Sequence, residues 1–247
     1  MAKVSGKKLG FGFSIENEIK DIQSFTTQVS SFSPSVTKTS RSYRVVNTNP
    51  YSFDWLGTAF FTGNFKYKGW DWKAEAVRGT ISDFSMNYKE NCDLYGCDGN
   101  TGTFSVDKLG KYSMDFQDFI SLQPKQVSQK LFKGNDTITG SNYNDTLKGY
   151  DGNEKLVGGK GTNKLYGGKG EDTFSMDKNG VQKIMDFNAK EDIIDLPGQP
   201  SSWSKYGHVQ TSKKNMFFGM YGETSKDNYF ISLKSKQAFA IEDLNII

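Results

Sequence analysis

Acidic residues recur every nine positions in the middle of the chain, in a glycine-rich setting that suits metal binding. Between residues 131 and 175 the sequence reads as five nonapeptides, LFKGNDTIT, GSNYNDTLK, GYDGNEKLV, GGKGTNKLY and GGKGEDTFS. The sixth position is acidic in four copies and an amide in the other, giving Asp136, Asp145, Glu154, Asn163 and Asp172. A period this short, unbroken over five copies, is typical of a solenoid rather than of a globular loop.

The eighth position of the repeat is apolar in every copy, with Ile138, Leu147, Leu156, Leu165 and Phe174 in turn. Only the middle one of the last three positions is apolar, which is the alternation of a short β-strand with one buried side chain. Two copies then form one turn of a flattened helix, and each strand pairs in parallel with the strand two copies further on. Stacked turns lie roughly 4.8 Å apart, so every second sixth-position residue is brought close together.

This stacking predicts two edges, one with Asp136, Glu154 and Asp172 and the other with Asp145 and Asn163. Carboxylates stacked so closely repel one another, and glycine-rich loops lose much conformational freedom on ordering. A hard divalent cation compensates for both costs. Ca²⁺ takes roughly six to eight oxygen ligands, which two carboxylates and exposed loop carbonyls can supply, whereas Mg²⁺ prefers a small octahedron and keeps its waters.

The nonapeptide is similar to the G-G-x-G-x-D-x-U-x repeat of the RTX family, the hemolysin-type calcium-binding repeats. The resemblance implies a parallel β-roll in which sixth-position acids and loop carbonyls bind Ca²⁺ while the U residue fills the core. Carried over to this sequence, the implied ligands are Asp136, Asp145 and Asp172, with Glu154 as a longer version of the same acid. Asn163 stands at the equivalent position, and Asp151, at position three, is an additional acid.

The sequence also departs from the family pattern. Asn163 lacks a charge, Tyr143 replaces a glycine, and Leu131 and Phe132 replace the opening glycines. Several lysines lie on or beside the loops, although the family is usually acidic. We therefore expect one good edge, from copies one, three and five, and one doubtful edge. The alternative is a β-roll whose degenerate copies bind no metal.

The resemblance continues beyond the repeats. Residues 172–196, DTFSMDKNGVQKIMDFNAKEDIIDL, resemble the segment that closes RTX rolls, and residues 43–120 resemble more loosely the β-rich segment that precedes them. The ending EDLNII is similar to that of type I secretion substrates, and an ordinary final β-strand is the alternative. Export of this kind agrees with an N-terminal stretch that lacks the apolar core of a signal peptide.

The flanking elements are predicted from hydrophobic periodicity. Residues 14–30 carry Ile15, Ile19, Ile22 and Phe25 at helical spacing, which predicts one short amphipathic helix or an arm that packs on a neighbour. Residues 31–42 are rich in Ser and Thr and are interpreted as a linker. Short strands rich in aromatic and β-branched residues are expected from 43 to 88, and 114–131 is consistent with a short helix.

Together these patterns predict an all-β fold, in which a short parallel β-roll of nonapeptide repeats is flanked by β-rich regions and preceded by one short N-terminal helix. The expected organisation is an N-terminal arm with helix and linker (1–42), a β-rich domain (43–130), the calcium-binding roll with its closing segment (131–196) and a C-terminal β cap (197–247).

Composition argues against several classes of function. The net charge is +3 and the basic residues are scattered, whereas nucleic-acid binding usually needs a concentrated basic stripe. No run approaches the roughly twenty apolar residues of a membrane span. A zinc site near Cys92 and Cys97 would need further nitrogen or sulfur ligands, and His208 is the only histidine. The spacing of the two cysteines leaves a local disulfide open.

Sequence motifs of common catalysts are missing. There is neither H-E-x-x-H nor G-x-S-x-G, so we expect no zinc-protease or lipase-type site and no enzyme. Trp55, Trp70 and Trp72 fall in the first β-rich region. They suit either a sugar-stacking surface or, as is more usual for aromatics at strand spacing, packing of the sheet.

The leading hypothesis is a non-enzymatic calcium-binding β-roll protein, serving as a structural or adhesive component of an extracellular or surface assembly. Its expected partners are calcium ions and other protein subunits of that assembly. One alternative is a phage virion protein, such as a capsid decoration or tail component. Another is a secreted glycan-binding module.

Overall fold

The computed structural model describes residues 1–7, 9, 12–27, 35–39, 41–47, 56–67, 77–89, 92–93, 96–97, 101–177, 180–196, 207–220, 229–240 and 243–247. Trp55, Trp70 and Trp72, the candidates for sugar stacking, lie outside these residues. The chain folds as two compact units. The first contains residues 1–10 and 15–131, and the second contains residues 11–14 and 132–247.

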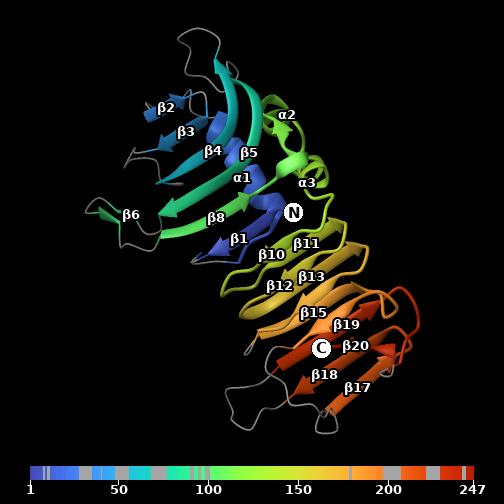
Figure 1. Cartoon of the computed structure of the whole chain (residues 1–247). Coiled ribbons are helices and arrows are strands. Elements are labelled where there is room, and N and C mark those ends of the chain that lie inside the picture. Colours follow the sequence, from blue (N-terminus) through green and yellow to red (C-terminus); the bar gives the residue numbers. More distant parts are fainter. Residues whose placement is uncertain are drawn as a thin grey trace. The chain divides into compact units, whose positions relative to one another are not determined.

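The first unit is built on an antiparallel sheet with the strand order β2-β3-β4-β5-β8-β1 (Figure 1). A short strand, β9, pairs with β5. Its strands are β1 (Lys3–Lys7), β2 (Ser35–Thr39), β3 (Ser42–Asn47), β4 (Leu56–Tyr67), β5 (Val77–Lys89), β8 (Thr101–Asp107) and β9 (Met114–Asp115). The strands expected between residues 43 and 88 are therefore confirmed.

Two expectations for the N-terminal region are wrong. The linker expected at residues 31–42 includes β2, which pairs antiparallel with β3 from Ser35 to Thr39. Thr and Val favour strands, and an exposed partner strand is enough to recruit a Ser/Thr-rich segment. Residues Lys3–Lys7, expected in an arm, form β1 and pair antiparallel with β8.

Cys92 and Cys97 lie opposite each other in the backbone register of a two-stranded ladder. The strands are β6 (Cys92–Asp93) and β7 (Gly96–Cys97). Their side chains lie outside the described part of the chain, so a disulfide between them stays a prediction.

The expected N-terminal helix is present as α1 (Ile15–Thr27), and Ile15, Ile19 and Ile22 of its apolar stripe are buried. The core of the first unit contains an aromatic cluster in which Phe119 packs against Phe84 at 5.0 Å and against Phe61 at 5.5 Å between ring centroids. Edge-to-face pairs of this kind add to the stabilisation that comes from burying the rings.

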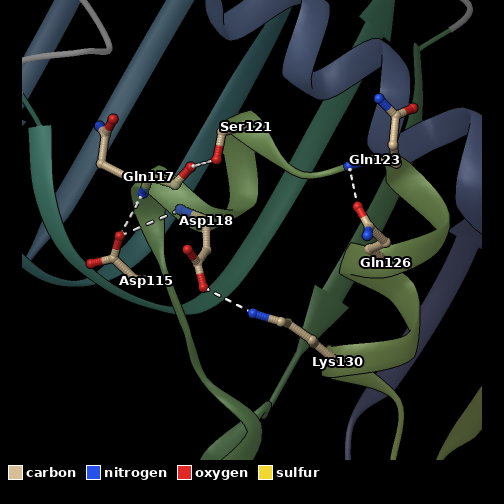
Figure 2. Close-up of polar contacts among 7 residues, drawn as sticks. All are labelled: Asp115, Gln117, Asp118, Ser121, Gln123, Gln126 and Lys130. Carbon is tan, nitrogen blue, oxygen red and sulfur yellow. Dashed lines mark hydrogen bonds and ion pairs between the residues drawn. The ribbon is translucent and has the colours of Figure 1, made fainter.

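Two further helices, rather than one, precede the repeats: α2 (Phe116–Ser121) and α3 (Pro124–Leu131). Figure 2 shows that the Asp115 carboxylate caps α2, accepting hydrogen bonds from the backbone N–H groups of Gln117 at 2.8 Å and Asp118 at 3.4 Å. The side chains of Lys130 and Asp118 form an exposed ion pair at 3.0 Å that links the two helices. A 3-10 turn (Gly110–Tyr112) lies upstream.

The second unit contains two sheets with mainly parallel strands (Figure 1). One sheet has the order β10 (Thr137–Thr139), β12 (Lys155–Val157), β14 (Thr173–Ser175), β16 (Ile193–Asp195) and β20 (Asn245–Ile246). The other has the order β11 (Thr146–Asp151), β13 (Gly161–Lys169), β15 (Gly180–Phe187), β19 (Tyr229–Ser235), β18 (Asn215–Met220) and β17 (Gly207–Ser212). Among the described strands of this unit, the antiparallel pairs are β17 with β18 and β18 with β19.

The register of the parallel strands confirms the predicted roll. Thr137 aligns with Lys155 and Thr173 in one sheet, and Thr146 aligns with Lys164 in the other, so each copy pairs with the copy two further on. The eighth-position residues of all five copies are completely buried: Ile138, Leu147, Leu156, Leu165 and Phe174. These side chains form the core between the two sheets.

The end of the chain takes the form of a β-strand. β20 pairs in parallel with β16, and the Ile247 backbone N–H donates to the Ile194 carbonyl at 3.1 Å. The secretion-signal hypothesis for these residues stays a prediction. Within the described part of the chain, no helix is long and apolar enough to span a membrane.

Candidate metal centre

The sixth-position residues line the two edges of the roll as the stacking predicts. Backbone hydrogen bonds fix their spacing, because the N–H group after each one donates to the carbonyl of its counterpart in the preceding turn. Lys155 N donates to Asp136 O at 2.8 Å, and Thr173 N donates to Glu154 O at 2.7 Å. Ile193 N donates in the same way to Asp172 O at 2.7 Å, which adds Asp192 to the row.

We call this row, Asp136, Glu154, Asp172 and Asp192, the carboxylate edge. The opposite row contains Asp145, Asn163 and Gln182, aligned through the pairing of β11, β13 and β15, and we call it the amide edge. All seven side chains are buried. The two edges therefore enclose similar environments but differ in charge.

Glu154 lies at the centre of the carboxylate edge and is 1% exposed. Neither of its side-chain oxygens has a hydrogen-bond partner among the described residues. A Cβ atom added to Gly152, whose φ is 141°, would meet Glu154 Oε1 at 2.5 Å and the Gly134 carbonyl oxygen at 2.5 Å. Glycine at this position therefore lets a carboxylate and a loop carbonyl approach the same small space.

Burial and mutual repulsion disfavour negative charge along this edge. Burial raises the pKa of Glu154 to about 9, and the nearby carboxyl groups of Asp172 and Asp136 add to the effect. Burial likewise raises the pKa of Asp172 and brings that of Asp192 to about 7. A carboxylate row with such pKa values is stabilised in its charged form only by a compensating cation.

Other carboxylates of this edge receive backbone donors. Asp172 Oδ1 accepts from Glu154 N at 2.9 Å, and Asp192 Oδ1 accepts from Asp172 N at 3.1 Å. Asp192 Oδ2 also accepts from Asn188 N at 2.7 Å. Asp186, on β15 and outside this row, accepts from Gly167 N at 3.0 Å through Oδ1, and burial raises its pKa. These bonds orient Asp172 and Asp192 along the row, whereas both side-chain oxygens of Glu154 lack a hydrogen-bond partner among the described residues.

The amide edge is bonded throughout. Asp145 accepts from Phe13 N at 2.7 Å and from Ser141 N at 2.6 Å, and burial raises its pKa against the effect of these bonds. Asp145 N in turn donates to Asn163 Oδ1 at 2.8 Å. The Asn163 amide nitrogen lies 3.2 Å from Gln182 Oε1, which continues the chain into the next turn.

A family model described as the RTX calcium-binding nonapeptide repeat, in four copies, matches residues 132–164 and 149–175. The chain carries RTX calcium-binding repeats. Among solved structures, it is similar to the solution structure of the AlgE6R3 subunit from the Azotobacter vinelandii mannuronan C5-epimerase, with 24% identity over 46% of this chain and 73% of that chain and a TM-score of 0.36. A search of curated proteins gave no match.

The roll extends past the matched RTX repeats. Gln182 and Asp192 occupy sixth positions of a further turn, although they follow Asn163 and Asp172 by 19 and 20 residues instead of 18. Neither was among the candidate ligands, and Asp186 was also missed. The D-F and D-x-I-D-L motifs of the closing segment contain Asp186 and Asp192 and are the signal that could have found them.

Asp151 lies apart from the carboxylate edge of the RTX roll. Its side chain is 54% exposed and forms an ion pair with Lys169 at 3.1 Å. The structure thus groups Asp136, Glu154 and Asp172 on one edge, Asp145 and Asn163 on the other, and brings Asp151 to neither. The role of these residues as ligands stays a prediction.

The oxygen donors of the carboxylate edge fit Ca²⁺. Among the described residues, no three or more His, Cys, Asp or Glu side chains form a group that could hold a metal ion. A site between stacked RTX loops does not require one, since two carboxylates are completed by loop carbonyls such as that of Gly134. The unbonded oxygens of Glu154 mark the place where such a cation would supply what the protein does not.

Proposed function

We propose that this protein binds Ca²⁺ along the carboxylate edge and acts as a calcium-stabilised structural or adhesive component of an extracellular or surface assembly. The observation that carries the metal part of the proposal is Glu154, a fully buried acid that lies between two further acids. Neither of its side-chain oxygens has a hydrogen-bond partner among the described residues. Without a cation, the buried carboxyl must give up its charge. With one, Glu154 and its neighbours become ligands.

Calcium then acts on folding through mass action. A ligand that binds only the native state stabilises it, and a concentration a hundredfold above Kd contributes about 2.7 kcal/mol. At the low calcium level of a cell interior the carboxylate edge stays open. In a calcium-rich extracellular medium the same edge orders, so folding is coupled to export.

A structural role is supported by the residue types of the repeat. Its chemistry-bearing positions are acids and glycines that serve loop geometry, and the sequence carries neither H-E-x-x-H nor G-x-S-x-G. Calcium-ordered turns give a rigid stack with sheets on two faces. Rigidity of this kind suits a protein that holds position in a coat or matrix.

The metal part is tested by calorimetric titration of the purified full chain with Ca²⁺, with Mg²⁺ as the comparison ion. Glu154→Gln should weaken calcium binding at least about tenfold, because it removes a charged ligand from a buried site. Glu171→Gln is the matched control, since Glu171 adjoins Asp172 but is exposed. Equal calcium affinity in wild type and Glu154→Gln would contradict the assignment.

The assembly part needs a separate measurement. Light scattering during size-exclusion chromatography, with Ca²⁺ and with chelator, reports the mass of the particle. We expect self-association, or association with surface material of the producing cell, in the calcium-bound form. A monodisperse monomer that binds no cell-surface fraction under either condition argues against the structural or adhesive role.

A further inference from the structure

The side-chain amide of Asn163 occupies a place between stacked loops where the carboxylate edge offers only oxygens. Its Nδ2 atom lies 3.0 Å from the Lys160 carbonyl oxygen and 3.3 Å from the Gly159 carbonyl oxygen, both in its own loop. It also lies 3.2 Å from Gln182 Oε1 in the following turn. The Asn163 amide therefore donates to the Lys160 and Gly159 carbonyls, which would otherwise be available to bind a cation.

Gln182 completes this closure from the next turn. Its Nε2 atom donates to the Gly159 carbonyl at 2.8 Å, so that carbonyl receives donors from two side chains. A Cβ atom added to Gly158 would lie 1.9 Å from Gln182 Oε1. The space between the two loops is therefore filled by amide groups in direct contact with the backbone.

The single acid of the amide edge is also satisfied by the protein. One oxygen of Asp145 accepts from Phe13 N and the other from Ser141 N, while the Ser141 hydroxyl donates to the same carboxylate at 2.9 Å. On the carboxylate edge, by contrast, Glu154 has no donor for either oxygen among the described residues. Among the described residues, both oxygens of Asp145 are therefore hydrogen-bonded, whereas both oxygens of Glu154 are not.

We propose that the amide edge is closed without metal by the Asn163–Gln182 bridge, so that calcium binds this roll on its carboxylate edge alone. The second half of the statement rests on the proposed function. The first half stands on the hydrogen bonds of Asn163 and Gln182 and makes its own prediction. The side chains of Asn163 and Gln182 thus hold the amide edge together by hydrogen bonds that do not depend on calcium.

The test counts bound Ca²⁺ per chain, by native mass spectrometry and by equilibrium dialysis, in the full-length protein and three variants. Asp145→Asn should bind as many ions as wild type, because Asp145 is no ligand. Asn163→Asp should bind one ion more, because it replaces an amide donor with a carboxylate that faces Asp145 and the loop carbonyls. Asn144→Asp is the matched control, since Asn144 is exposed on the same edge, and it should leave the count unchanged.

The outcomes separate the inference from the function on which it partly rests. A loss of bound calcium in Asp145→Asn overturns the inference, and this variant carries the test even when Asn163→Asp does not fold. If wild type binds no calcium, the proposed function fails. The amide bridge then still stands if Asn163→Asp gains an ion over wild type, and it falls if a folded Asn163→Asp binds none.

Discussion

The two edges of the roll have the same backbone and the same buried surroundings, yet they solve the problem of stacked loops differently. On one edge the side chains of Asp136, Glu154 and Asp172 are buried in one row, and the Glu154 oxygens have no hydrogen-bond donor among the described residues. On the other edge Asn163 and Gln182 supply both donors and acceptors. A neutral amide bridge works at any calcium concentration, whereas a carboxylate row works only when a cation is supplied.

The core beneath the edges does not share this difference. Leu156 and Phe174 on one sheet and Leu147 and Leu165 on the other are equally buried. The contrast is therefore set at one position of the nonapeptide, where the choice between acid and amide decides whether a turn depends on metal. A roll with one edge of each kind keeps its loop spacing on the amide edge while the carboxylate edge orders on calcium binding.

The largest expected effect tests whether the two sheets really contribute equally to the core. Leu156→Ala and Leu165→Ala each remove a completely buried side chain. Each should lower the free energy of unfolding by about 3 kcal/mol, within the usual range for such cavities. Chemical denaturation in saturating calcium measures both, and Tyr166→Phe serves as a mild control on the same strand. A difference of more than about 2 kcal/mol between the two variants would show an asymmetric core.

Chelation tests the carboxylate edge directly. Removing calcium from a protein saturated a hundredfold above Kd should cost about 2.7 kcal/mol. For a unit of this size the melting temperature should then fall by on the order of 10 °C, as calorimetry would show. Glu154→Gln should respond much less to chelator than wild type. An unchanged melting temperature in wild type would sink the claim that calcium stabilises the roll.

Much of the roll could be predicted from sequence because its signal is periodic. The phase of the nonapeptide fixes which residue is buried, and Ile138, Leu147 and Leu156 all lie where that phase predicts. The period also fixes the parallel register and therefore the membership of the two edges. Each of these inferences follows from strand geometry and needs no knowledge of distant contacts.

What escaped prediction depends on contacts that have no local signature. Gln182 and Asp192 join the edges although the spacing has slipped, because strand pairing tolerates extra residues in the connecting loops. β2 forms because β3 offers it a pairing partner, which Ser/Thr-rich composition does not reveal. Asp151 is exposed and pairs with Lys169 of the next turn, a contact that its place in the nonapeptide does not reveal.

Deleting the amide should be costly on the other edge and insensitive to calcium. Asn163→Ala removes the acceptor for Asp145 N and the donor to Lys160 O, and it leaves the buried Asp145 N–H without this acceptor. We expect a loss of about 2 kcal/mol in the free energy of unfolding, equal in calcium and in chelator. Denaturation curves under both conditions measure it. A loss that appears only with calcium present would mean that Asn163 acts through a metal after all.

Glu154→Gln, studied in chelator, places on the carboxylate edge the same kind of amide side chain that the amide edge has at Asn163 and Gln182. The change removes a buried acid beside Asp136 and Asp172 and supplies an amide donor near the Gly134 carbonyl. The metal-free variant should therefore be about 1 kcal/mol more stable than metal-free wild type, although it binds calcium less well. Melting curves in chelator decide the matter, with Glu171→Gln as the exposed control. A less stable metal-free variant would show that Glu154 already has its charge compensated by the protein.

The smallest expected effect lies on the outer faces of the sheets. Lys164 and Lys183 are exposed and directly aligned on β13 and β15, whereas on the other sheet Lys155 forms an ion pair with Asp195 at 3.3 Å. Lys164→Thr removes the like-charge alignment and copies Thr146 of the same row. It should raise the free energy of unfolding by about 0.5 kcal/mol at low ionic strength, an increment that salt abolishes. Lys155→Thr should show no such gain, because Lys155 faces an acid. If both variants gain equally, the outer faces do not differ electrostatically, and the contrast between the two sides of the roll is confined to its loops.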